Sequence, residues 1–230
     1  MTSILAVTCA TGGADHAVMT DRMIDSLLSC KGTGELRVVA VAQALDGRIH
    51  GGEGITVIED SVNRGFGEGM NTAIDHGLKG FEVDKVLVLN NDLRFPEENW
   101  IKRLLSAPYW PVKSPTMDNT GTAMLKADGP RKGIDYYPFV GATCWMVDAR
   151  LLFRMMRKHG YWLFDPEFGL GYGEDDYAAV MIQRLTGEAK PFQVVRSAWV
   201  QHYRAQTSKG LKIDRKAQSA LLKRKLAQRR

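Results

Sequence analysis

Short apolar runs that alternate with helical stretches constrain the fold of this chain more than any other feature. Buried strands are predicted at about 4–10, 36–42, 55–58, 85–89, 139–147 and 192–196. Helices are predicted at about 15–30, 71–78, 96–105, 149–158 and 174–185. Apolar strands that alternate with helices are typical of a parallel sheet covered on both faces. The sequence therefore predicts an α/β fold with a mostly parallel sheet flanked by helices, in which ligands bind at the carboxyl ends of the strands.

The length of 230 residues fits one large domain. A hydrophobic fraction of 44% and a charged fraction of 25% are typical of a soluble globular protein. The region 106–135 is rich in Pro, Gly and Lys, and it is predicted to form long loops with one or two strands at most. Because the chain has no internal repeat and no low-complexity linker, we expect a single domain over 1–208, followed by a tail over 209–230.

The tail is strongly basic. It holds nine Lys or Arg residues and one acid, Asp214, so its formal charge is +8 and that of the other 208 residues is −3. Ala217, Leu221 and Leu222 predict a short amphipathic helix in the tail. Such a tail can bind a nucleic-acid backbone or an anionic membrane surface. A solubilising terminal helix is an equally simple interpretation.

Other features favour a cytoplasmic location. No apolar run approaches the ~20 residues that cross a bilayer, and the N-terminus has no basic leader before its short apolar stretch. Cys9, Cys30 and Cys144 are scattered without metal-ligand spacing, so we expect buried thiols in a reducing compartment. A cytoplasmic protein is therefore expected, held at the inner membrane face or on DNA if the tail binds there.

An acidic segment, Phe164–Tyr177, interleaves five acids with aromatic rings and reads FDPEFGLGYGEDDY. Solvated acidic runs lack such rings, which tend to be buried. A carboxylate near them is poorly solvated, so its pKa rises toward the range of a general base. Glu174, Asp175 and Asp176 also begin a helical pattern, and an N-cap with first-turn acids explains them equally well.

The triplet Asn90-Asn91-Asp92 ends a predicted buried strand. Asp92 would point a carboxylate into the ligand crevice, where a divalent cation that bridges two phosphates takes oxygen ligands. Asn90 offers a neutral oxygen on the same side. A strand-ending turn explains the same residues, because Asn and Asp favour turns. A lone His202 is more often structural, and it becomes a metal-ligand candidate only together with Asp92.

A glycine-rich segment, Asn63–Asn71 with the sequence NRGFGEGMN, precedes a predicted helix. Its glycines would let the backbone approach a ligand, Arg64 would meet phosphate charge, and the helix start behind it favours anions. The segment matches neither the Walker pattern nor the dinucleotide fingerprint, which argues against kinases, ATPases and NAD enzymes. A loop before a helix is the simpler alternative.

Taken in order, these motifs resemble those of one family. The chain reads N-x-G-F-G-x-G-x-N, a hydrophobic strand with N-x-D, G-A-x-x-W-M-V, F-D-P-E-F…G-E-D-D and W-V-x-H-Y. This order and spacing resemble the inverting GT-A glycosyltransferases, in particular the family-two group that includes rhamnosyltransferase-like enzymes. The resemblance covers about two-thirds of the chain, from Val57 to Ser208.

The resemblance implies a role for each matching residue. Asp175 resembles the catalytic base, and Glu174 would hold the acceptor hydroxyl or tune that base. Asp92 and His202 resemble ligands of Mg²⁺ or Mn²⁺, which would bind the diphosphate of the donor. The residues that match the donor site are Asn63, Arg64, Gly65, Gly67, Asn71, Asn90, Gly141, Ala142 and Trp145. Two acids at the base position would raise each other's pKa.

The resemblance implies inverting transfer of a hexosyl or deoxyhexosyl group from a nucleotide-diphosphate sugar to an acceptor hydroxyl, with a cell-surface or lipid-linked glycan as the acceptor. A hydroxymethylated base of viral DNA is the alternative acceptor, and it would be flipped out to reach Asp175. A non-enzymatic nucleic-acid-binding protein would explain the basic tail but leave the acidic segment without a purpose. A nucleotidyltransferase would normally have a Gly-rich, basic signature near the first strand, which ATGGADH lacks.

Overall fold

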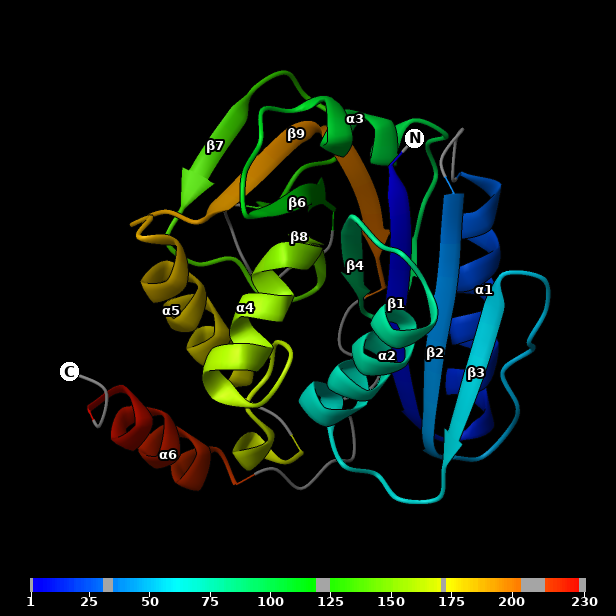
Figure 1. The fold of residues 1–230 in the computed structure, drawn as a ribbon. Helices are drawn as coiled ribbons and strands as arrows, with labels where there is room; N and C mark the ends of the chain where they lie inside the picture. Colours follow the sequence, from blue (N-terminus) through cyan, green and yellow to red (C-terminus); the bar gives the residue numbers. More distant parts are fainter. Residues whose placement is uncertain (1, 31–34, 119–124, 171–172, 204–213, 228–230) are drawn as a thin grey trace.

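The computed structural model describes residues 2–30, 35–118, 125–170, 173–203 and 214–227. Within these residues, a nine-stranded sheet lies at the centre with helices on both faces (Figure 1). The strand order is β3-β2-β1-β4-β8-β6-β9-β5, and β7 pairs with β9. The predicted α/β class, with a central sheet flanked by helices, is confirmed.

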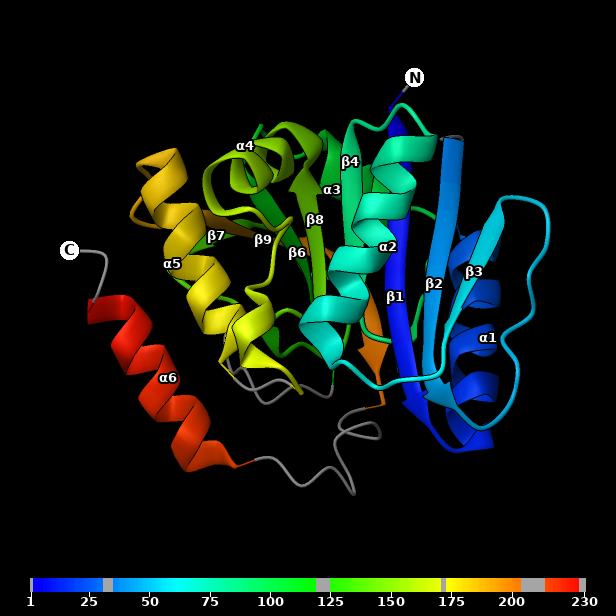
Figure 2. The same ribbon diagram turned by 60° about the horizontal axis from the view of Figure 1, so that its bottom comes forward.

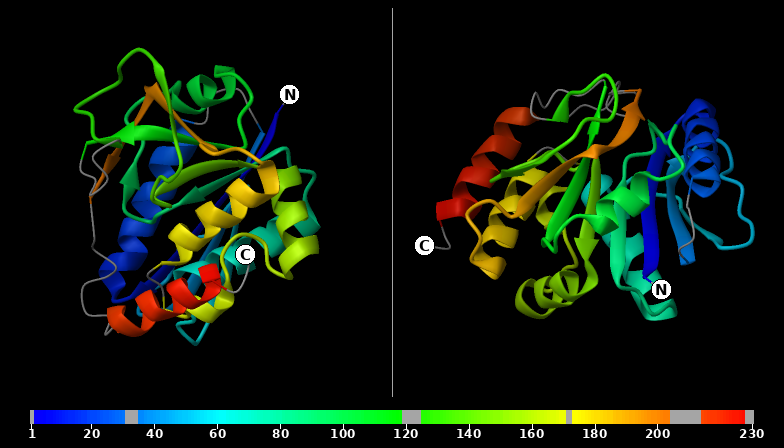
Figure 3. Two further views of the ribbon diagram at one scale, coloured as in Figure 1. Left: turned by 90° about the vertical axis from the view of Figure 1, so that its left-hand side faces the viewer. Right: turned by 90° about the horizontal axis from the view of Figure 1, so that it is seen from above.

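The N-terminal half of the sheet is parallel and follows the predicted runs closely. Its strands are β1 (Ser3–Gly12), β2 (Glu35–Leu45), β3 (Ile55–Asp60) and β4 (Lys85–Leu89). The helix α1 (Ala14–Ser29) covers one face, and α2 (Phe66–Gly80) covers the other (Figure 3). Because both faces are covered, the centres of β1, β2 and β4 are apolar, and Leu5, Val39 and Val88 are fully buried.

The C-terminal half of the sheet is mixed rather than parallel. Its first strand, β8 (Cys144–Asp148), begins beside the carboxyl end of β4, where the backbone N–H of Asn90 donates to the carbonyl oxygen of Thr143 at 3.0 Å. β8 therefore runs antiparallel to β4. The remaining strands are β6 (Val112–Met117), β9 (Phe192–His202), β5 (Leu93–Arg94) and β7 (Ile134–Tyr137). The parallel pairing predicted for the sheet holds through its first four strands, and β8 reverses the direction after them.

Some predicted boundaries are wrong. The helix α3 (Trp100–Ser106) begins four residues after Pro96, where the prediction placed its start. The predicted strand 139–147 is a loop as far as Thr143, because the backbone N–H of Thr143 donates to the carbonyl oxygen of Gly141 at 2.8 Å and closes a tight turn. This turn leaves the backbone before β8 exposed to the carboxyl edge of the sheet.

The strand β6 lies in the region 106–135, which is predicted to form long loops with one or two strands at most, and it is buried along its whole length although it contains Lys113 and Pro115. Lys113 Nζ donates to the carbonyl oxygens of Leu104 and Ala107, both at 2.8 Å. Burial, together with the charge of Lys85, lowers the pKa of Lys113 to about 8. A buried lysine that binds main-chain carbonyls leaves no apolar pattern in the sequence, so the position of this strand within the region could not be predicted.

The remaining elements are α4 (Ala149–His159), the 3-10 helix η2 (Pro166–Phe168), α5 (Glu174–Thr186) and α6 (Arg215–Ala227). The first turn of α5 carries the three consecutive acids, as predicted. The tail contains α6, which lies beside η2 and α5 (Figure 2). Across the described ranges, no helix has both the length and the apolar character that a membrane span needs.

The three cysteines are free thiols. Burial, followed by the charge of Glu174, raises the pKa of Cys9 to about 12, and burial also raises the pKa of Cys144. Only the thiolate reacts with iodoacetamide, and at pH 8 its fraction at Cys9 is roughly a thousand-fold below that of an ordinary thiol. We expect native Cys9 and Cys144 to resist iodoacetamide, and urea-unfolded protein to take up the label at both, as read by mass spectrometry. Because Cys9 is partly exposed, rapid labelling of native Cys9 would contradict its raised pKa.

Candidate active site at the carboxyl edge of the sheet

Asp92 and His202 lie next to each other although 110 positions separate them. β5 begins directly after Asp92 and pairs antiparallel with the end of β9, so that Leu93 lies opposite His202. The backbone N–H of Tyr203 donates to the carbonyl oxygen of Asp92 at 2.9 Å. This pairing brings Asp92 Oδ1 to 3.2 Å from His202 Nε2, and the two side chains are only 2% and 9% exposed. Two residues singled out from separate motifs therefore meet in one buried position.

Two neighbouring side chains position this pair. Asp118 follows β6, and its Oδ1 accepts the backbone N–H of His202 at 3.0 Å. Asn91 turns the other way and donates from Nδ2 to Thr20 Oγ1 in α1 at 3.2 Å. Asn91 therefore anchors the turn after β4 to a helix. Sequence reasoning missed Asp118, because an acid at the end of an unrecognised strand carries no signal of its own.

The chemistry of Asp92 and His202 fits a divalent cation. The carboxylate suits Mg²⁺ or Mn²⁺, and imidazole is a common nitrogen ligand of divalent metals. Among the residues that the structure describes, no group of three or more His, Cys, Asp or Glu side chains could hold a metal ion. The pair would therefore bind a cation together with ligands from outside the described side chains, such as the phosphate oxygens of a nucleotide.

Asp175 lies in the first turn of α5, behind Gly173, whose φ of 95° favours glycine. Asp175 is half-buried. Burial raises its pKa, whereas the backbone N–H groups of Asp176 and Ala142 act in the opposite direction. Ala142, a predicted donor-site residue, therefore lies beside the carboxylate of Asp175. A raised pKa on a carboxyl group at the carboxyl edge of the sheet suits a general base.

Glu174 faces the start of α2. It is 8% exposed, and its Cγ lies 3.8 Å from the point where a side chain at Gly67 would begin. Its charge also contributes to the raised pKa of Cys9. The raised pKa of Asp175 comes from burial and not from the charge of Glu174, so this half of the expected mutual effect is not seen. The pKa of Asp176 is the one raised by burial and then by the charge of Asp175.

The glycines of the predicted turn approach other parts of the protein. Gly65 has a φ of +94°, and a Cβ there would lie 1.9 Å from the carbonyl oxygen of Gly169. A Cβ at Gly67 would lie 2.8 Å from Cβ of Phe164. α2 begins at Phe66, so Gly67 lies in its first turn and not in a loop before it. Close packing of α2 against the acidic segment is sufficient to require these glycines, and their place in the donor site stays a prediction.

Amide side chains also fasten this end of α2. Asn71, predicted at the donor site, uses both ends of its amide on the main chain: Nδ2 donates to the carbonyl oxygen of Phe164 at 2.6 Å, and Oδ1 accepts the backbone N–H of Phe164 at 3.1 Å. Gln43 at the end of β2 can donate to the carbonyl oxygen of Gly65 at 3.2 Å and accept the backbone N–H of Gly69 at 3.3 Å. Sequence reasoning missed Gln43, because a buried amide in an apolar strand shows no partner.

Asn63 and Arg64 lie between β3 and α2. Asn63 Oδ1 accepts the backbone N–H of Gly65 at 3.0 Å, which closes a turn. Arg64 Nε donates to Asp60 Oδ2 at 2.8 Å, and its side chain is 47% exposed. The guanidinium group has five N–H donors, so an arginine in this ion pair retains donors for an anion.

No protein-family model matches the sequence, and no curated protein matches it. Solved structures do match. A mannosyltransferase from Pyrobaculum calidifontis, solved with GDP-Man and Mn²⁺, is 14% identical with a TM-score of 0.61, over 88% of this chain and 57% of that one. S. aureus TarS with UDP-GlcNAc is 11% identical with a TM-score of 0.63, over 96% and 65%. GalNAc-T7 with UDP, GalNAc and Mn²⁺ is 13% identical with a TM-score of 0.63, over 90% and 45%. This protein has the GT-A fold.

The chain spans less than two thirds of the length of these three structures. At 11–14% identity the likeness establishes the GT-A fold alone. One fold hosts many activities, so the activity has to be argued from the residues of the site.

Trp145, predicted near the donor sugar, lies in the core of the GT-A fold and is fully buried. Its ring centroid lies 6.2 Å from that of Phe164 and 5.0 Å from that of Phe192. A side chain with no exposed surface cannot line a sugar, so this expectation is corrected. The ring of Trp145 instead packs near that of Phe164 in the acidic segment.

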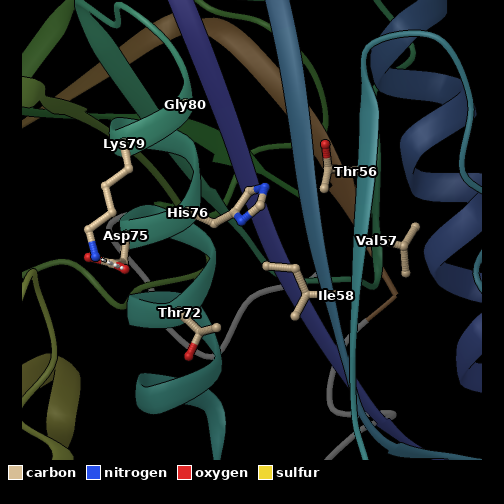
Figure 4. Close-up of a pocket in the computed structure, with 8 residues that line it drawn as sticks. All are labelled: Thr56, Val57, Ile58, Thr72, Asp75, His76, Lys79 and Gly80. Carbon is tan, nitrogen blue, oxygen red and sulfur yellow. Dashed lines mark hydrogen bonds and ion pairs between the residues drawn. The ribbon is translucent and has the colours of Figure 1, made fainter.

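A groove of the GT-A fold runs between α2 and the edge strand β3 (Figure 4). It is lined by Thr56, Val57, Ile58, Thr72, Asp75, His76, Lys79 and Gly80. Lys79 Nζ lies 2.7 Å from Asp75 Oδ2, and Trp162 Nε1 donates to Asp75 Oδ1 at 3.0 Å. The groove adjoins the C-terminal part of α2, whereas the predicted site residues gather around its N-terminal end. None of the predicted site residues lines the groove.

Proposed function

We propose that the protein is an inverting, divalent-cation-dependent glycosyltransferase that takes its sugar from a nucleotide-diphosphate donor. The observation that carries the proposal is the buried contact between Asp92 and His202 at 3.2 Å. Support also comes from the neighbours in fold, whose names include GDP-Man with Mn²⁺, UDP-GlcNAc, and UDP with Mn²⁺. A subgroup of rhamnosyltransferase-like enzymes is proposed on the order of the sequence motifs.

One stretch of backbone connects the proposed cation ligands with the proposed base. Asn90, two residues before Asp92, donates its backbone N–H to Thr143. Thr143 follows Ala142, which lies beside Asp175. We therefore propose that the donor sugar lies against Asn90 and Ala142, between the cation and the base. Gly141, in the same turn, belongs to this proposed donor site.

In the proposed reaction, Asp175 accepts the proton of an acceptor hydroxyl while that oxygen attacks the anomeric carbon. The new C–O bond forms as the bond to the nucleoside diphosphate breaks on the opposite face, which inverts the configuration. A carboxylate of raised pKa accepts the proton more readily. Asp92 and His202 would hold Mg²⁺ or Mn²⁺, whose positive charge would stabilise the departing diphosphate. Arg64, which retains donors at the surface, adds to that charge in the proposal.

We propose a cell-surface or lipid-linked glycan as the acceptor. Lys216, Lys223 and Arg224 on α6 are exposed and favour an anionic surface. The same residues favour the alternative acceptor, a hydroxymethylated base in DNA. A gel-shift titration with duplex DNA separates the two. Binding that weakens steeply with salt and is lost in the double variant Lys216→Gln, Lys223→Gln would favour DNA, and absence of binding keeps the glycan.

One class of nucleotide sugar is expected to raise the melting temperature, by a larger amount when Mn²⁺ is present. A ligand at 100 times its Kd stabilises the native state by about 2.7 kcal/mol. Asp92→Asn is expected to abolish the part of the shift that depends on Mn²⁺, because it removes the anionic ligand. Differential scanning fluorimetry with GDP-, UDP- and dTDP-sugars measures both effects.

Asp128→Asn is the matched control for Asp92→Asn, because Asp128 is exposed and lies outside the proposed site. This control should keep the full Mn²⁺-dependent shift. If no nucleotide sugar shifts the melting temperature of the wild-type protein, the proposed function is wrong. If Asp92→Asn keeps the Mn²⁺-dependent shift, the cation binds elsewhere.

A further inference from the structure

α6 is attached to the rest of the protein through a buried lysine. Lys225 Nζ lies 2.6 Å from Asp165 Oδ2 and 2.7 Å from Glu167 Oε2. The side chains of Lys225 and Asp165 are only 10% and 5% exposed. Burial lowers the pKa of Lys225, but the hydrogen bonds to the two carboxylates outweigh this effect and the pKa is raised. Lys225 therefore remains charged and holds two acids, and it does not belong to the solvated part of the tail.

The contacts of α6 fall on both sides of Asp175 along the chain. Before Asp175, Gln218 Nε2 donates to the carbonyl oxygen of Phe168 at 3.1 Å. After it, Lys225 Nζ lies 5.6 Å from the ring centroid of Tyr177, within the first turn of α5. Figures 2 and 3 show α6 running beside η2 and α5. A single helix therefore contacts the acidic segment at both ends.

Apolar side chains complete this contact. Leu222 lies 3.7 Å from the point where a side chain at Gly173 would begin, next to the start of α5. Leu221, Leu222 and Leu226 pack against the core. The ring centroids of Phe168 and Tyr177 lie 5.7 Å apart, which joins the two contacted ends to each other. By contrast, Lys223 is exposed, so α6 has one packed face and one basic face.

We propose that α6 holds the first turn of α5, and with it Asp175, in the position needed for proton transfer, and that Lys225 is the positioning residue of this contact. Lys225 does not touch the reacting atoms in this proposal. It acts through Asp165 and Tyr177, which flank the base. A displacement of about 1 Å at a reacting group can lower turnover about 100-fold. The role of Asp175 rests on the proposed function, but the contact of α6 with α5 does not.

The test compares Lys225→Met with Lys223→Met, which removes the same charge from the exposed face of the same helix. Hydrogen exchange by mass spectrometry follows the backbone amides of 174–178. In Lys225→Met we expect these amides to exchange at least about 10-fold faster. Turnover is expected to fall roughly 10- to 100-fold, while the Mn²⁺-dependent thermal shift with the donor stays within about twofold. Lys223→Met should match the wild-type protein in amide exchange and in the Mn²⁺-dependent thermal shift, the two measurements that do not involve the acceptor.

Two further variants keep the proposal testable if Lys225→Met does not fold, because that change leaves Asp165 buried without its cation. Glu167→Gln removes only the more exposed carboxylate, and it should accelerate exchange in α5 by a smaller factor. Lys225→Arg keeps the charge and should restore most of the turnover. Unchanged exchange in both Lys225→Met and Glu167→Gln would overturn the proposal.

Faster exchange with unchanged turnover would also overturn the positioning role, because it would show a contact that serves stability alone. If the wild-type protein has no turnover with any donor, the proposed function fails. The exchange of 174–178 then still decides whether α6 holds α5.

Discussion

Replacing Asp175 with asparagine is expected to lower turnover by roughly 10²- to 10⁴-fold while the donor still binds. The amide cannot accept the proton of the acceptor hydroxyl, whereas its size matches that of the carboxyl group. Donor binding should persist because the proposed cation ligands lie outside α5: Asp92 directly precedes β5, and His202 is the last residue of β9. Release of the nucleoside diphosphate measures turnover, and the Mn²⁺-dependent thermal shift measures donor binding.

Asp176→Asn is the control for this variant. Asp176 is the next residue along the chain, but it is exposed, so the same change there should leave turnover close to the wild-type value. Unchanged turnover in Asp175→Asn would remove Asp175 from the role of base. Equal losses in both variants would point to the net charge of the first turn of α5 and not to one proton acceptor.

Because the pKa of Asp175 is raised, kcat/KM is expected to rise with pH while the contribution of Asp175 to the free energy of unfolding falls. The native state holds the proton of Asp175 more tightly than the unfolded chain does. Its contribution to the free energy of unfolding is therefore present below the ordinary carboxyl pKa and lost as pH rises through the raised value. Turnover needs the deprotonated form, so kcat/KM should fall as pH falls through the same window. Asp175→Asn should remove the part of the pH dependence of the free energy of unfolding that is due to Asp175. A smaller pH dependence should remain, because the pKa of Asp176 is also raised.

Gly65→Ala is expected to lower the free energy of unfolding by about 3 kcal/mol or more. The methyl group would lie 1.9 Å from the carbonyl oxygen of Gly169, and a φ of +94° is strained for alanine. Both problems involve main chain, so no side-chain rotation relieves them. Gly80→Ala is the control, because nothing lies within 4 Å of its Cβ position. It should change stability by less than about 1 kcal/mol, in the stabilising direction.

Urea unfolding followed by circular dichroism measures both glycine variants. A loss below about 1 kcal/mol in Gly65→Ala would show that α2 and the acidic segment are not in the close contact described. A loss accompanied by a changed slope with urea would indicate a change in the unfolded or native state beyond the local clash.

The parts of the protein that the sequence predicts well depend on local or repeated patterns. The four parallel strands are apolar on both faces because helices cover both, and this leaves continuous apolar runs. The three acids at the start of α5 follow from a helical pattern with acids in its first turn. The pairing of Asp92 with His202 was expected from a resemblance of motifs, since neither residue carries a sufficient signal alone.

The parts that the sequence does not predict depend on contacts between distant segments. β6 is hidden because Lys113 is buried through bonds to main-chain carbonyls. The glycine at position 65 looks like a ligand-binding glycine, whereas its neighbour is the backbone of Gly169. Lys225 looks like any other residue of a basic tail, although it is buried against Asp165. In each example a polar or small residue serves a tertiary contact, and composition cannot distinguish that use from a solvated one.

The direct contact of Gly65 with Gly169, together with the bonds between Asn71 and Phe164, has a consequence for protein engineering. The main chain at the start of α2 packs directly against the main chain of the acidic segment. A chimaera that imports the acidic segment of another GT-A protein, in order to change its acceptor, would place foreign backbone against this helix start. Because the two segments pack so closely, we expect such a chimaera to fold well only if both segments are exchanged together.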